Sequence, residues 1–286
     1  MKRLLILSGK GGTGKTTTAA AFLRFAGARA AADCDVDAPN LHLVLDRTAQ
    51  PQDTDFFGGD KAVIDPVACV GCGACARHCR FDALEQRDGV YAVNEFSCEG
   101  CGVCAQVCPA GAVKLLPDVA GRKSLYVGDS VFSTAELNMG RGNSGKLVSE
   151  VKQAMLKNAP DCDLAVIDGS PGIGCPVISS VSGVDLVLVV AEPSLSGLSD
   201  LGRLVKTAQT LGTRLAVCVN KYDVCPAQAE AIQAFCRDSG IPFVGMLPYD
   251  PQASRVINQG HSVADVDCPL RTALERVFQA TLELLA

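Results

Sequence analysis

Short apolar runs alternate with longer amphipathic segments along most of this chain. Five of the runs predict buried strands, because they are apolar throughout and are not alternately polar; they lie at residues 3–8, 164–169, 185–192, 214–221 and 242–248. Helical spacing of apolar positions is found at 14–27, 144–158, 198–212 and 227–240. Strands that alternate with helices predict an α/β fold with a mostly parallel sheet flanked by helices.

A cysteine-rich block at residues 69–108 interrupts this alternation. The polar stretch 46–60 before it is interpreted as a linker, and the stretch 117–123 after it carries proline and glycine, as exits from a domain often do. Residues 124–143 fit no single element, and a hairpin that returns to the sheet is one interpretation.

The interruption predicts a discontinuous core with a small α+β domain inserted into it. The core comprises residues 1–59 and 117–286, and the inserted domain comprises residues 60–116.

Composition narrows the class of protein. Of the 286 residues 48% are hydrophobic, which is ample for a buried core, and the net charge of −5 argues against a general nucleic-acid binder. The apolar run at residues 3–8 is too short for an export signal, and no run is long enough to span a bilayer. Fifteen cysteines in such a chain indicate a reducing cytoplasm and metal ligation.

Eight of the cysteines form two runs with one spacing, C-x2-C-x2-C-x3-C, as in bacterial two-cluster ferredoxins. The first three cysteines of such a run bind one 4Fe–4S cluster, and the fourth binds the other cluster. The first cluster is therefore predicted to bind Cys69, Cys72, Cys75 and Cys108. The second is predicted to bind Cys98, Cys101, Cys104 and Cys79. Zinc sites and disulfides are the alternatives, and the doubled spacing favours clusters.

The segment GKGGTGKTT at residues 9–17 matches the phosphate-binding loop pattern G-x4-G-K-[ST]. Backbone amides of such a loop bind phosphate oxygens. Lys15 is predicted to pair with the β and γ phosphates, and Thr16 to hold Mg²⁺. The nucleotide site is predicted to comprise Gly11, Gly12, Thr13, Gly14, Lys15, Thr16 and Thr17.

The additional lysine in KGGTGKT, Lys10, resembles the deviant Walker-A ATPases, the group of MinD, ParA, the nitrogenase iron protein and iron–sulfur carrier ATPases. The segments at 32–40 and 167–176 resemble the two switches of that family, and 248–260 its late loop over the base. The whole arrangement is most similar to MinD-superfamily ATPases with an inserted ferredoxin domain.

The resemblance implies roles for individual residues. Lys10 would reach the nucleotide of a partner subunit, and Asp35 would position the attacking water. Asp168 would bind Mg²⁺ through water, and Asn220 would lie against the purine. The implied protein is a homodimer with ATP or ADP and Mg²⁺ at its interface.

Together these features predict an ATP-dependent switch, with Lys10, Lys15 and Asp35 as catalytic residues, that couples hydrolysis to electron transfer toward a redox partner. An iron–sulfur carrier that serves client proteins is one alternative. A positioning or redox-sensing ATPase of the MinD/ParA kind is another. The amphipathic segment at 269–286 is expected to pack on the core and not to enter a membrane.

Overall fold

The computed structural model describes residues 1–45 and 49–286, which divide into two compact units. The larger unit contains Met1–Thr54, Lys123–Glu136 and Ser144–Ala286. The smaller unit contains Asp55–Arg122 and Leu137–Asn143. The first three residues of the stretch interpreted as a linker, 46–48, lie outside the described residues.

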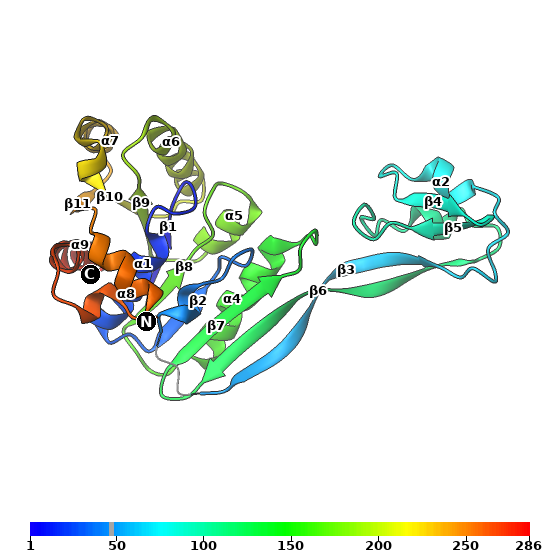
Figure 1. Cartoon of the computed structure of the whole chain (residues 1–286), viewed down its shortest axis with the longest axis horizontal. Coiled ribbons are helices and arrows are strands. Elements are labelled where there is room, and N and C mark those ends of the chain that lie inside the picture. The colour runs from blue at the N-terminus through cyan, green and yellow to red at the C-terminus, as the bar shows by residue number, and fades with distance from the viewer. Residues whose placement is uncertain (46–48) are drawn as a thin grey trace. The chain divides into compact units, whose positions relative to one another are not determined.

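A mostly parallel sheet forms the centre of the larger unit (Figure 1). Its strand order in the described residues is β11-β10-β9-β1-β8-β2-β7-β6-β3. The strands are β1 (Lys2–Leu7), β2 (Ala30–Asp33), β3 (Pro51–Ile64), β6 (Val113–Val127), β7 (Val131–Leu137), β8 (Leu164–Asp168), β9 (Leu186–Ala191), β10 (Leu215–Asn220) and β11 (Phe243–Leu247). β1 pairs in parallel with β8 and β9, which explains why its side chains from Leu4 to Leu7 are buried.

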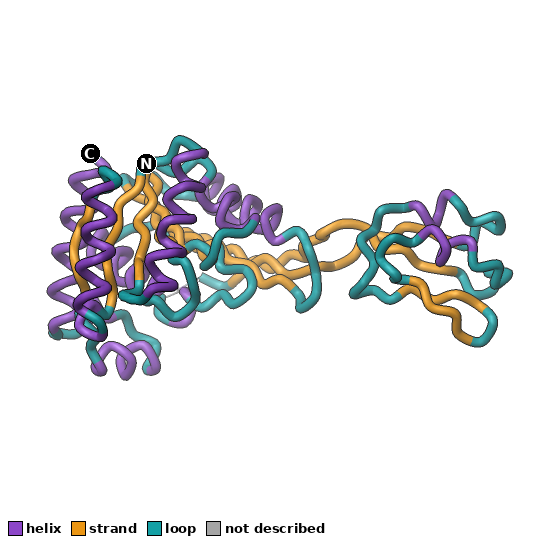
Figure 2. The backbone as a smooth tube through the Cα atoms, turned by 90° about the horizontal axis from the view of Figure 1, so that it is seen from above, coloured by secondary structure: helices purple, strands orange, loops and turns teal. Residues whose placement is uncertain are grey.

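Helices lie on both sides of the central strands, as Figure 2 shows. They are α1 (Lys15–Ala26), α4 (Ser144–Asn158), α5 (Cys175–Val181), α6 (Leu195–Thr210), α7 (Pro226–Asp238), α8 (Pro251–Asn258) and α9 (Pro269–Leu285). α1 packs against α9, where the rings of Phe22 and Phe278 meet edge to face with centroids 5.0 Å apart. The five predicted strands and four predicted helices are all present, so the α/β fold is confirmed.

The C-terminal helix α9 belongs to this core. Leu274, Val277 and Phe278 on one of its faces are buried against the apolar centre of the larger unit. In the described part of the chain, no helix combines the length and the apolar character that crossing a membrane requires.

The interpretation of the flanks of the cysteine block was wrong. Residues 51–60 belong to β3, and residues 117–123 lie inside β6. Both segments are rich in polar residues because much of their surface is exposed, so the hydrophobic pattern of a buried strand is missing. β6 and β7 are joined by only three residues, 128–130, which makes them a hairpin, as expected for 124–143.

The smaller unit has little regular structure besides β3 and β6. It contains α2 (Ala74–His78), α3 (Val103–Gln106) and an antiparallel pair of strands, β4 (Leu84–Arg87) and β5 (Val90–Val93). The cluster of buried side chains at its centre is small and consists of Ala62, Ala83, Cys98 and Val113.

Candidate functional sites

The phosphate-binding loop connects the end of β1 to the start of α1. Gly12 and Gly14 have φ angles of 78° and 94°, a conformation that favours glycine. A Cβ atom on Gly14 would also lie 2.2 Å from the Asn220 side-chain nitrogen. The loop therefore needs glycine at residue 14 for two independent reasons.

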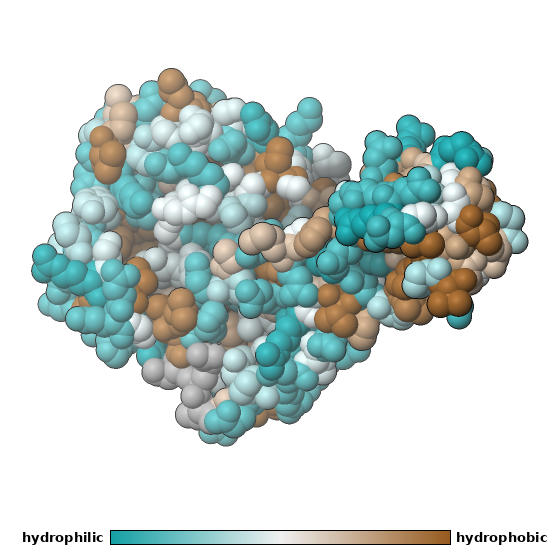
Figure 3. Space-filling view, turned by 45° about the vertical axis from the view of Figure 1, so that its right-hand side comes forward, coloured by the Kyte–Doolittle hydropathy of each residue, from teal (hydrophilic) through white to brown (hydrophobic). Residues whose placement is uncertain are grey.

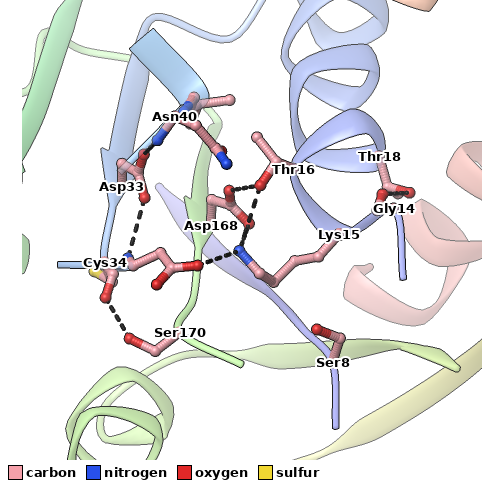
Figure 4. A network of polar contacts seen from close by, with 12 residues as sticks. Ser8, Gly14, Lys15, Thr16, Thr18, Asp33, Cys34, Asn40, Asp168 and Ser170 are labelled. Carbon is pink, nitrogen blue, oxygen red and sulfur yellow. Dashed lines mark hydrogen bonds and ion pairs between the residues drawn. The ribbon is translucent and has the colours of Figure 1, made fainter. Parts of the chain in front are cut away.

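Lys15 stands at the centre of a network of buried charges (Figure 4). Its Nζ atom lies 2.8 Å from Oδ1 of Asp168 and 3.5 Å from Oδ2 of Asp35. Thr16 Oγ1 donates to Oδ2 of Asp168 at 2.6 Å. Burial alone would lower the pKa of Lys15, but the Asp168 and Asp35 carboxylates outweigh it and raise that pKa. Lys15 is therefore a fixed positive charge beside the loop.

Asp33 holds the segment of the first switch in place. Its carboxylate is fully buried and accepts hydrogen bonds from the backbone amides of Asp35, Asn40 and Leu41 at 2.9 to 3.0 Å. Burial and the Asp168 carboxylate raise the pKa of Asp33 to about 7, while the amides of Leu41 and Asp35 and the charge of Lys15 oppose the rise. The three bonds fix the backbone on both sides of Asp35, whose own side chain reaches Lys15.

A cavity of about 1140 Å³ opens beside this network. Its volume is large enough for a nucleotide, because ligand pockets are typically about 300–1,000 Å³. The phosphate-binding loop and Asp35 line one part, and Pro171 and Gly174 of the second switch line another. A third part is lined by residues at and just after the end of the expected base loop, namely Ile257, Asn258 and Gly260 to Val263.

Lys10 and Asn220, which are also predicted to contact the nucleotide, have partners within the chain as well. Lys10 Nζ forms an ion pair with Glu192 at 2.7 Å and lies 3.5 Å from Ser196 Oγ, and its side chain is partly exposed. Asn220 is buried and donates to the carbonyl oxygen of Thr13 at 2.7 Å. Asn220 therefore stabilises the phosphate-binding loop through the backbone of Thr13. Its contact with a nucleotide base stays a prediction.

The eight cysteines of the two runs surround two separate cavities in the smaller unit. One cavity is lined by Cys69, Cys72, Cys75 and Cys108. The other is lined by Cys79, Cys98, Cys101 and Cys104. The structure thus brings together the same two groups of four that the spacing predicts.

The backbone beside these cavities has glycines with positive φ angles and amides that donate to cysteine sulfur. Gly71, Gly73, Gly100 and Gly102 all have φ angles between 66° and 80°. The amides of Ala83 and Ala112 donate to the sulfur atoms of Cys79 and Cys108, at 3.5 and 3.3 Å. In the described residues, no three Cys, His, Asp or Glu side chains converge closely enough to hold a single metal ion.

Each cavity has one cysteine at the surface of the smaller unit. Cys72 and Cys101 are exposed, whereas Cys75 and Cys98 are buried. Next to the exposed pair, Val70 is 69% and Val103 is 40% accessible to solvent. Figure 3 shows brown, apolar surface on this unit.

The fold and the phosphate-binding loop agree with a comparison against protein families. The CobQ/CobB/MinD/ParA nucleotide-binding domain matches residues 4–263, which is most of the chain. The chain belongs to this family. Its fold is that of the P-loop ATPases with a mostly parallel sheet.

Comparisons with individual proteins give further context. An uncharacterized protein of Methanocaldococcus jannaschii is 34% identical over 224 residues, 77% of this chain and 78% of that protein. The cytosolic Fe–S cluster assembly factor NBP35 of Eremothecium gossypii is 30% identical over 139 residues, 42% of each chain. The septum site-determining protein MinD of Pyrococcus horikoshii, solved with Mg-ADP, has the same fold, with a TM-score of 0.59, 17% identity and coverage of 99% and 96%.

Sequence reasoning missed some residues that line the nucleotide cavity in this family member. Ser144, at the start of α4, and Leu43 and Val44, after the first switch, all contribute to its wall. No local motif marks them, because they reach the cavity through packing of segments distant in the sequence.

Cys34 of the first switch is fully buried, and burial raises the pKa of its thiol, as for a packing residue. Cys175 is exposed at the start of α5.

Proposed function

We propose that this protein is an ATP-hydrolysing, dimeric switch that gates electron transfer through two bound 4Fe–4S clusters. The observation that carries the proposal is the grouping of eight cysteines around two cavities, four to each, on a chain that also has a nucleotide-sized cavity at its phosphate-binding loop. The domain boundaries 1–59, 60–116 and 117–286 remain part of this proposal.

The nucleotide half uses charges that are already in place. Lys15 is held by Asp168 and Asp35, and the negatively charged phosphates of ATP would replace these carboxylates as its partners. Thr16 and Asp168, which are hydrogen-bonded to each other, would hold Mg²⁺ directly and through water. Asp35 would then be free to orient the attacking water. The phosphates would be surrounded by Gly11, Gly12, Thr13, Gly14 and Thr17. Asn220 would lie against the base.

Lys10 is the residue that would sense the partner subunit. Its ion pair with Glu192 lies partly exposed, so little energy is needed to release it. In a homodimer with nucleotide at the interface, Lys10 would leave Glu192 and bind phosphate of the opposite subunit. ATP would thereby favour the closed dimer over separate chains.

The cysteine half fits 4Fe–4S clusters by the chemistry of its donors. Cys69, Cys72, Cys75 and Cys108 would hold one cluster, and Cys79, Cys98, Cys101 and Cys104 the other. Bound clusters would supply one-electron redox chemistry. The amides of Ala83 and Ala112 donate to cysteine sulfur, as amides around such clusters do, and would stabilise the thiolate charge. A cytoplasmic redox protein would approach where Cys72 and Cys101 are exposed.

The deciding experiment is a redox titration of anaerobically purified protein, followed by electron paramagnetic resonance, with and without a non-hydrolysable ATP analogue. We expect about eight irons per chain and a spectrum or potential that changes with the analogue. Far fewer irons would contradict the cluster assignment. Full iron with no response to nucleotide would contradict the gating.

A second candidate function is that of an iron–sulfur carrier, which the similarity to NBP35 favours. The observation against it is that Cys75 and Cys98 are buried, because buried ligands retain their clusters. Mixing the loaded protein with an apo acceptor distinguishes the two functions. Transfer of iron to the acceptor at a rate comparable to ATP turnover would support the carrier.

A third candidate is a positioning or redox-sensing ATPase, which the MinD and ParA members of the family favour. ATP-dependent binding to liposomes or to DNA would support it. The net charge of −5 weighs against nucleic acid, so we expect no binding to DNA.

A further inference from the structure

We propose that the segment Leu137–Asn143 transmits the nucleotide state to the second cysteine group, with Arg141 as its positioning residue. The inference rests on the proposed function, since it names the part of the chain through which gating would act. It is drawn from an unusual property of this segment, which belongs to the smaller unit although the residues before and after it belong to the larger one.

The segment is held in the smaller unit by specific polar contacts. The backbone amide of Asn138 donates to the carbonyl oxygen of Ala120 at 2.8 Å. The side chain of Asn138 donates to the carbonyl oxygen of Val119 at 3.0 Å. The side chain of Asn143 donates to the carbonyl oxygen of Gly58. Both ends of the segment are therefore bonded to the backbone of the two long strands, β3 and β6.

Arg141 makes the densest set of contacts in the segment. Its guanidinium donates to the carboxylate of Glu95 at 2.5 Å and to the Glu95 carbonyl oxygen at 3.2 Å. It also forms an ion pair with Asp118 at 3.2 Å and lies over the ring of Phe96, 5.7 Å from its centroid. The side chains of Arg141 and Asp118 are only 12% and 17% accessible, so their ion pair is shielded from solvent and from salt, whereas the Glu95 side chain is 58% accessible.

Two of the residues that Arg141 contacts, Glu95 and Phe96, lie in the turn that leads into the second cysteine group. In this turn the amides of Ser97 and Cys98 both donate to the carbonyl oxygen of Asn94, at 3.2 and 3.0 Å. Cys98 is buried and lines the second cavity. A displacement of Arg141 would therefore change the position of a predicted cluster ligand three residues from Glu95.

The other end of the segment continues directly into the nucleotide site. Ser144 follows Asn143, begins α4 and lines the nucleotide cavity. A Cβ atom on the next residue, Gly145, would lie 3.4 Å from the Cβ and carbonyl oxygen of Cys175, the first residue of α5. The start of α4 is thus in close contact with the helix that follows the second switch.

A buried lysine holds α4 to the far end of α5 as well. Lys152 of α4 donates to the carbonyl oxygens of Ser179, Ser180 and Ser182, at 2.6 to 2.9 Å. Because α5 is attached at both of its ends, a movement of the second switch would move α4 with it. That movement would reach Asn143 and Arg141 through the continuous chain.

The test compares Arg141→Ala with Arg87→Ala in iron-loaded, full-length protein. Arg87 is a matched control, because it also pairs with a glutamate of the smaller unit, Glu85 at 2.8 Å, but is exposed. Two readouts are measured with and without a non-hydrolysable ATP analogue: the paramagnetic spectrum of the reduced clusters and hydrogen exchange of the amides at residues 94–98. We expect Arg141→Ala to reduce the nucleotide-induced change by about fivefold or more. ATP turnover and iron content should stay unchanged.

A second variant, Glu95→Gln, removes the charge of the carboxylate but keeps the contact between Arg141 and the Glu95 carbonyl oxygen. It allows the test to be made if Arg141→Ala loses iron. It should reduce both responses in the same direction. If the unmodified protein responds to nucleotide and both variants respond as strongly, the role of Arg141 is overturned and the proposed function stands. If the unmodified protein responds in neither readout, both proposals are overturned.

Discussion

The two units of this protein achieve order by different means. The larger unit buries continuous apolar strands under helices, and its charged site is held together by its own side chains, with Lys15 bound to Asp168 and Asp35. The smaller unit encloses mainly small side chains and cysteines around two cavities. A site made of matched charges can exist before its ligand arrives, whereas a shell of thiols depends on what it encloses.

Removal of the proposed 4Fe–4S clusters should therefore have the largest effect, and it should affect the two units differently. After anaerobic chelation we expect the smaller unit to lose its structure, because its central buried side chains, Ala62, Ala83, Cys98 and Val113, provide little apolar surface. The larger unit should keep its fold and bind ATP. Limited proteolysis with mass spectrometry would locate new cleavage sites within residues 55–122. Equal protection of both units would contradict the comparison.

The substitution Lys15→Ala should affect the charged site of the larger unit and leave the smaller unit unchanged. We expect ATP turnover to fall by about 10²–10³-fold, because a buried positive charge is lost from the phosphate site. The iron content and the cluster absorbance should not change. Lys206→Ala is the control, since Lys206 is exposed on α6. Turnover that survives Lys15→Ala would show that the phosphate site has been assigned to the wrong residues.

Asp33→Asn tests whether the charged site is preformed by the first switch. An asparagine retains only one oxygen acceptor, so bonds from the amides of Asn40 and Leu41 or of Asp35 are lost. We expect the larger unit to lose roughly 1–3 kcal/mol of stability, measured by urea unfolding. Asp129→Asn, at an exposed position between β6 and β7, should have no measurable effect.

Glu192→Gln should have the smallest effect. It removes the ion pair that holds Lys10 within its own chain, and partly exposed pairs contribute about 0.2–1 kcal/mol. We expect ATP-dependent dimers to tighten by up to about fivefold, measured by sedimentation, with no change without nucleotide. Weaker dimers in this variant would show that Glu192 itself belongs to the interface.

Local sequence patterns were sufficient to predict most of the larger unit's strands and helices and the grouping of the eight cysteines. Buried strands such as Leu186–Ala191 are apolar throughout and bounded by polar residues, and the fourth cysteine of each run follows from spacing alone. The local pattern does not predict β2, because its sequence, AAAD, has low strand propensity. The placements of Lys10 on Glu192 and of Asn220 on Thr13 join distant parts of the chain, so no local pattern predicts them.

The cysteine-bearing segment enters through β3 and leaves through β6, which are neighbours in the sheet, and this has a consequence for how such a protein can arise. Beyond these two strands the amide of Asp65 still donates to the carbonyl oxygen of Ala112 at 2.9 Å. The cysteine-bearing segment thus replaces what would otherwise be the tip of a plain hairpin. A single gene insertion or excision at that tip, closed by a short turn, would leave the pairing of β3 and β6 intact, so this architecture is open to acquiring, losing or exchanging the segment in one genetic event.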